Sequence, residues 1–114
     1  MNSTENCSHA SLRDHAAQAC GLLKTLANED RLLLLCALAE TRKNVGELEQ
    51  LTGVAQPSLS QQLGVLRNEG LVETSKEGRY VYYRIKDARA EYLMRALWEL
   101  FCAPDAPSSG GAPD

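Results

Sequence analysis

Four cysteines could carry redox or ligand chemistry in this 114-residue chain, and they stand at positions 7, 20, 36 and 102. No two of them form a C-x-x-C pair, which argues against a zinc knuckle and against a thioredoxin-type redox centre. In a reducing cytosol such residues remain thiols. We therefore expect a cysteine with a function here to be a sensor or a ligand rather than half of a structural disulfide.

A second group of side chains, between residues 56 and 79, suits contact with DNA. Hydroxyl and amide groups exchange hydrogen bonds with base edges in the major groove, and cations bind the phosphate backbone. The net charge of the chain is −3, but residues 54–86 hold five basic and three acidic side chains, so a DNA reader would use a local basic face. The candidate DNA-contacting residues are Gln56, Ser58, Ser60, Gln61, Gln62, Arg67, Lys76 and Arg79.

Helical periodicity places most of these residues on one element. Apolar side chains at spacings of three and four predict helices over residues 10–27, 29–41, 45–52, 56–68 and 88–102. Asn28 is expected to cap the second helix, and Gly53 to end the third. The third and fourth helices form a helix-turn-helix, whose second helix turns three leucines inward: Leu59, Leu63 and Leu66.

From Leu71 the apolar period changes to two, which predicts a β-hairpin. If Glu77-Gly78 is its two-residue turn, Thr74 pairs with Val81 and Val72 with Tyr83. A polar helix face or a charged turn, taken alone, is usually only solvated surface. Their order along the chain is what predicts a mainly α fold with a β-hairpin wing, a winged helix-turn-helix.

The rest of the pattern predicts one domain, over residues 10–102, with a flexible segment at 1–9 and a disordered Pro- and Gly-rich tail at 103–114. The longest apolar stretch, 32–39, is far shorter than the roughly 18–20 residues of a membrane span, and the N-terminus lacks a secretory signal. We expect a cytoplasmic protein without a membrane partner. The apolar stripes expected to face inward are Leu12, Ala16, Ala19, Leu23 and Leu26 on the first helix and Ala90, Leu93, Leu97, Leu100 and Phe101 on the last.

A family resemblance extends over residues 20–102. It is carried by LLKTLANEDRLLLLCALAE and by VGELEQLTGVAQPSLSQQLGVLRNEGLVETSKEGRYVYYRI, which resemble the ArsR/SmtB family of bacterial winged-helix repressors. The resemblance implies a homodimer joined by its first and last helices, which binds an imperfect palindrome in double-stranded operator DNA and releases it on a chemical cue. One departure is Ala55, where the family commonly has a capping serine.

Family members commonly sense metals, but the residues of their two usual metal sites are absent. One site needs a C-x-C where this chain has 46–49 (GELE), and the other needs a histidine on the last helix, which has none. Cys36 and Cys102 instead resemble the thiol pair of the subgroup that includes BigR, SqrR and HlyU. That resemblance implies that persulfide or polysulfide sulfur bridges the two thiols, lowers DNA affinity and derepresses sulfide-response genes, without a metal or other cofactor.

Several alternatives stay open at this stage. A lone cysteine among leucines, such as Cys36, is usually part of a core, and we expect Cys20 and Tyr83 to pack inward and Trp98 to lie at the dimer seam. A zinc or arsenite site built from Cys7 with histidines 9 and 15 and another thiol, or a general disulfide switch, would also make the chain a sensor. A winged helix that only binds proteins is a further rival. No set of residues matches an enzyme active site, so no catalytic activity is expected.

Overall fold

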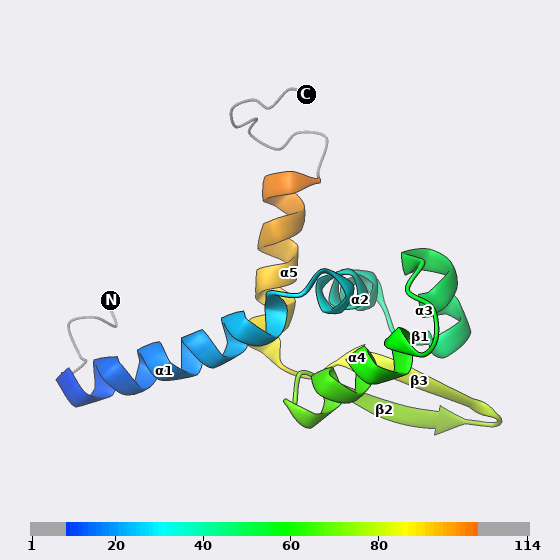
Figure 1. The fold of residues 1–114 in the computed structure, drawn as a ribbon, viewed down its shortest axis with the longest axis horizontal. Helices are drawn as coiled ribbons and strands as arrows, with labels where there is room; N and C mark the ends of the chain where they lie inside the picture. The colour runs from blue at the N-terminus through cyan, green and yellow to red at the C-terminus, as the bar shows by residue number, and fades with distance from the viewer. Residues whose placement is uncertain (1–8, 103–114) are drawn as a thin grey trace.

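The computed structural model of the protein describes residues 9–102, in which α1 and α5 extend away from a cluster of three shorter helices and a small sheet (Figure 1). The predicted flexible N-terminal segment, up to residue 8, and the predicted tail lie outside the described residues. In chain order the elements are α1 His9–Leu26, α2 Glu29–Glu40, β1 Lys43–Asn44, α3 Val45–Thr52, α4 Ser58–Asn68, β2 Val72–Glu77, β3 Tyr80–Ile85 and α5 Ala88–Phe101.

Polar side chains and one glycine set the helix ends. Asn28 caps α2 as predicted, because its side chain accepts a hydrogen bond from the backbone N–H of Arg31 at 2.9 Å. α3 begins with a capping box in which Asn44 and Glu47 each accept a backbone N–H of the other. Gly53 ends α3 with a φ of 76°, the left-handed conformation predicted for this residue.

The hydrophobic core lies between α2, α3, α4, the sheet and the start of α5. The three leucines predicted to face inward from α4 are buried, and α2 contributes Leu34, Leu35 and Leu38. Leu48 on α3 and Met94 on α5 complete the contact between these helices. Tyr83 packs against this core from β3, as expected.

The sheet differs from the predicted hairpin in two ways. The register is two residues off the prediction, since Thr74 pairs with Tyr83 and Val72 with Ile85, which makes Gly78-Arg79 the turn. Gly78 has a φ of 64° there, a conformation that favours glycine and so fixes the position of the turn. A short strand, β1, which the sequence did not indicate, pairs with β3 and makes β3 the central strand.

Most of the apolar stripe of α1 and the last two residues of the α5 stripe face no core within residues 9–102, contrary to prediction, whereas Ala90, Leu93 and Leu97 of α5 pack in or against the core as predicted. On α1 only Leu26 of the stripe is buried, whereas Leu12 and Leu23 are 49% and 56% exposed. At the end of α5, Leu100 and Phe101 are exposed as well. α1 projects from the other elements, so most of its length has no neighbour to pack against (Figure 1). Within the described residues, no helix is long and apolar enough to cross a membrane.

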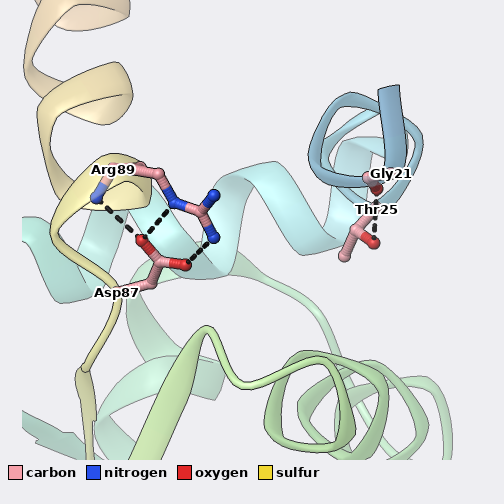
Figure 2. Close-up of polar contacts among 4 residues, drawn as sticks. All are labelled: Gly21, Thr25, Asp87 and Arg89. Carbon is pink, nitrogen blue, oxygen red and sulfur yellow. Dashed lines mark hydrogen bonds and ion pairs between the residues drawn. The ribbon is translucent and has the colours of Figure 1, made fainter. Parts of the chain in front are cut away.

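The first turn of α5 is fixed by a carboxylate. Asp87 accepts a hydrogen bond from the backbone N–H of Arg89 at 2.8 Å and also binds the guanidinium of Arg89 through both of its oxygens (Figure 2). This guanidinium holds the pKa of Asp87 below its usual range. Near the end of α1, the Thr25 hydroxyl donates to the carbonyl of Gly21 at 3.2 Å (Figure 2).

Candidate functional site

α3 and α4 form the predicted helix-turn-helix, and α4 presents a polar face. Ser60, Gln61 and Arg67 are exposed on it, while Ser58 and Gln62 are half-buried at its edge. The opposite face of α4 is held by its three buried leucines, which fix the helix against α2. The exposed residues therefore sit on a rigid scaffold, as base-reading side chains require.

Three predicted DNA-contacting residues in and just before α4 form side-chain hydrogen bonds within the chain. Gln56 accepts the backbone N–H of Ser60 at 3.0 Å, which supplies a cap where Ala55 and Pro57 provide none. Ser58 and Gln62 instead bond side chains of α2, and both partners, Asp30 and Arg31, were missed at the sequence level. No sequence pattern connects these α2 residues with α4, because the pairs are 28 and 31 positions apart.

Two cationic side chains lie at the tip of the wing. Lys76 and Arg79 are both exposed beside the turn, as predicted from the sequence. The Arg79 guanidinium lies 5.3 Å from the centre of the Tyr80 ring and donates to its hydroxyl at 3.3 Å, which holds the cation in place.

Arg42 joins the wing to the end of α2, a contact that no sequence pattern indicated. Its guanidinium binds both carboxylate oxygens of Glu77, one of them at 3.0 Å, and lies 4.2 Å from the centre of the Tyr82 ring. The hydrogen bond from Arg42 lowers the pKa of Glu77. The tip of β2 is thus bonded to the segment that follows α2.

Cys36 is exposed on α2, which corrects the expectation for a lone cysteine among leucines. Its Sγ lies 3.8 Å from the Sδ of Met94, at the wall of an open groove of about 550 Å³ between α2, α3 and α5. The groove is mainly apolar, and its other lining side chains include Leu33, Leu51 and Trp98.

Cys102 caps the C-terminal end of α5, and its thiol is exposed. Partial burial raises the pKa of the Cys36 thiol, and the charge of a Cys102 thiolate raises it further. The two thiols therefore lie within electrostatic reach of one another.

The remaining cysteines and the alternative metal site stand as follows. Cys20 is exposed on α1, so it does not pack inward within the described residues as expected. Cys7, part of the alternative metal site, lies outside the described residues. Between residues 9 and 102, no group of three or more His, Cys, Asp or Glu side chains could hold a metal ion.

Comparison with known proteins identifies the family to which this fold belongs. The model of the arsR family of bacterial regulatory proteins matches residues 28–74, from the cap of α2 into β2. The biofilm growth-associated repressor of Xylella fastidiosa (strain 9a5c) is 47% identical over 82% of this chain and 82% of its own length. The chain belongs to the arsR family. Its reported relatives are regulators rather than enzymes, as predicted, and a helix-turn-helix is the element with which such regulators bind DNA.

Other members of the arsR family support the same fold. The transcriptional activator HlyU of Vibrio cholerae is 38% identical over 80% of this chain and 84% of its own length. The crystal structure of the repressor BigR from Xylella fastidiosa superposes with a TM-score of 0.77 at 45% identity, covering 85% of this chain and 99% of that one. A homodimeric winged helix-turn-helix DNA-binding domain from Mycobacterium bovis gives a TM-score of 0.62 at 33% identity, over 80% of this chain and 83% of that one. The predicted winged helix-turn-helix and the resemblance to BigR and HlyU are thus confirmed.

Proposed function

We propose that this chain is a dithiol-based transcriptional repressor. Its homodimer binds palindromic promoter DNA through α4 and the wing in the cytoplasm, and it releases the DNA when persulfide or polysulfide sulfur bridges Cys36 and Cys102. The observation that carries the proposal is the position of the two thiols. Cys36 is exposed on α2, Cys102 ends the helix packed against α2, and the charge of one thiol affects the pKa of the other.

The DNA-binding part of the proposal rests on the exposed polar face of α4 and the cations of the wing tip. Gln61 and Ser60 can exchange hydrogen bonds with base edges, and Arg67 near the end of α4 can bind phosphate. Lys76 and Arg79 add two cations at the wing tip. The relatives support repression in one case and activation in another, and we favour repression because the more similar protein is named a repressor.

The dimeric part rests on the apolar side chains that α1 and α5 leave exposed. Leu12 and Leu23 on α1 and Phe101 on α5 are not buried by any partner within residues 9–102. A second copy that covers them would remove this apolar surface from water, which is the usual driving force for a stable homodimer. The homodimeric state of the Mycobacterium bovis domain supports this arrangement.

The sensing chemistry balances with one class of oxidant, a low-molecular-weight persulfide RSSH. The Cys36 thiol loses its proton, and the thiolate attacks the terminal sulfur of RSSH and becomes a persulfide. RS⁻ leaves and takes up the proton that Cys36 has lost. A second RSSH lengthens this persulfide to Cys36–S–S–SH with release of a further RSH, and the Cys102 thiolate then attacks the middle sulfur, forms a trisulfide bridge and expels HS⁻. Each additional sulfur in the bridge consumes one further RSSH and releases one further RSH. Extra sulfur atoms relax the Cα–Cα limit of about 7 Å that a plain disulfide imposes.

A bridge between these helices can reach the DNA through α2. α2 contacts α5, α4 and β3, so it touches both the proposed dimer helix and the two DNA-contacting elements. Fixing α2 to the end of α5 therefore changes how the recognition helices of the two protomers are spaced, and a palindrome reads that spacing.

The test combines mass spectrometry with DNA titration. A duplex that the reduced protein selects from a random library serves as the probe, and the protein is exposed to glutathione persulfide before titration. We expect Cys36 and Cys102 peptides joined by one or more added sulfur atoms, together with a weaker affinity for the duplex. Cys36→Ser and Cys102→Ser should each abolish the response, whereas Cys20→Ser, an exposed thiol on α1, should keep it. A protein that binds the duplex but gains no sulfur would refute the sensing mechanism, and a bridge without added sulfur would make it a general disulfide switch.

A further inference from the structure

The side chain of Arg31 joins three helices. It follows the cap of α2 and reaches backwards to α1, where its Nε donates to the carbonyl of Thr25 at 2.6 Å. That carbonyl belongs to the last turn of α1, whose carbonyls lack intrahelical partners. The Nη1 of the same guanidinium donates to the Oε1 of Gln62 on α4 at 2.9 Å.

These contacts fix which way the Gln62 amide points. A guanidinium has only hydrogen-bond donors, so the atom facing it must be the amide oxygen and not the amide nitrogen. The bond to Arg31 therefore directs Oε1 of Gln62 to α2 and leaves Nε2 for other partners. Within residues 9–102 this Nε2 has no hydrogen-bond partner, and the Gln62 side chain is half-exposed beside the polar face of α4.

A neighbouring bond holds the same part of α4. The Ser58 hydroxyl donates to Asp30 at 3.0 Å, so consecutive residues in the first turn of α2 bind two side chains one turn apart on α4. Both α4 side chains are half-buried, which limits competition from water. The amide of Gln62 is therefore preset before DNA arrives.

We propose that Arg31 is a positioning residue that sets the base specificity of α4, by directing the Gln62 oxygen to α2 so that Gln62 presents its N–H donors to the DNA. A free glutamine pairs with adenine, because it donates to N7 and accepts from the N6 amino group at the same time. With its oxygen directed to Arg31, Gln62 presents its N–H donors and matches the guanine edge, where N7 and O6 are both acceptors. This inference rests on the proposed function, in which α4 reads DNA.

Two substitutions test the proposal through opposite changes of hydrogen-bonding chemistry. Arg31→Met removes the donors and frees the amide oxygen, so the preference at one base pair of each half-site should move from guanine towards adenine by about tenfold. Gln62→Glu keeps a partner for Arg31 but presents acceptors only, so the preference at the same base pair should move to cytosine. The second substitution keeps the contact with Arg31, and thus remains informative if Arg31→Met fails to fold.

The assay measures the affinities of the full-length dimer for the selected duplex and for its single base-pair variants. Arg89→Met is the matched control, because it also removes a guanidinium that binds two oxygens, but on α5, and it should leave the base preferences unchanged (Figure 2). A second readout is the salt dependence of binding. Removing a phosphate contact lowers the slope of log K against log salt by about one, whereas removing a positioning residue leaves it unchanged.

The outcomes separate this inference from the proposed function. A shift at one shared base pair in both variants, with an unchanged salt slope, supports the positioning role. An equal loss of affinity for all duplexes, shifts at different base pairs, or no change with Gln62→Glu overturns it. If the wild-type dimer selects no duplex at all, the DNA-reading function itself is wrong.

Discussion

Replacing Met94 by alanine should destabilise the protein strongly, although this residue lies next to an open groove. Its side chain is 1% exposed and packs between α5 and α2, where its sulfur contacts Cys36. Met→Ala in a core costs about 2–5 kcal/mol, and neighbours can relax into a cavity that borders a groove, so we expect about 2–3 kcal/mol. For a domain of this size that loss lowers Tm by roughly 10–20 °C.

Leu51→Ala is the control, because Leu51 lines the same groove but is 62% exposed. It should cost less than about 0.5 kcal/mol, and Met94→Leu, which keeps the volume, less than about 1.5 kcal/mol. Urea unfolding at one fixed protein concentration gives all three values, since the stability of a dimer depends on concentration. Equal losses for Met94→Ala and Leu51→Ala would show that the contact between α2 and α5 is not the packed junction described above.

Three further predictions concern the thiols, the wing and a cap. In Cys102→Ser, the pKa of Cys36 should fall because the neighbouring thiolate charge is gone, so iodoacetamide should alkylate Cys36 faster at pH 8 and its pH–rate profile should move to lower pH, as read by mass spectrometry. Lys76→Ala and Arg79→Ala should each reduce the salt slope of DNA binding by about one if both cations contact phosphate, and an unchanged slope would exclude that contact. Asn44→Ala breaks the capping box of α3 and should cost about 1 kcal/mol in thermal unfolding, whereas no loss would mean that water replaces the cap.

Periodicity predicted the helices because their apolar spacing reflects burial that each helix achieves with its immediate neighbours. The leucines of α4 and the cap at Asn28 are determined within one or two turns, and both are as expected. The stripes of α1 and α5 show the limit of the same reasoning. A pattern reports that a face is apolar, but it does not report whether the chain itself or a second molecule covers that face.

The hairpin register and the contacts between α2 and α4 could not be predicted from the sequence, for a different reason. Shifting a hairpin by two residues keeps every side chain on its face, so alternation alone cannot distinguish the two pairings, and the positive φ of Gly78 decides between them. The partners of Ser58 and Gln62 come from a helix far earlier in the chain. For the thiols, the sequence indicated the pair, but the exposure of Cys36 follows from its turn of α2 facing the groove rather than the core.

The connection after α2 has a mechanical consequence for the wing. Only residues 41–42 separate α2 from β1, and Arg42 also binds Glu77 next to the turn of the wing. Any displacement of α2 therefore acts on the wing at two points, on β3 through the paired strand β1 and near the turn through the exposed ion pair of Arg42 with Glu77. Dissolved ions screen the second link but leave the first intact. Concentrated salt therefore weakens the ion pair between Arg42 and Glu77, while α2 stays connected to β3 through β1.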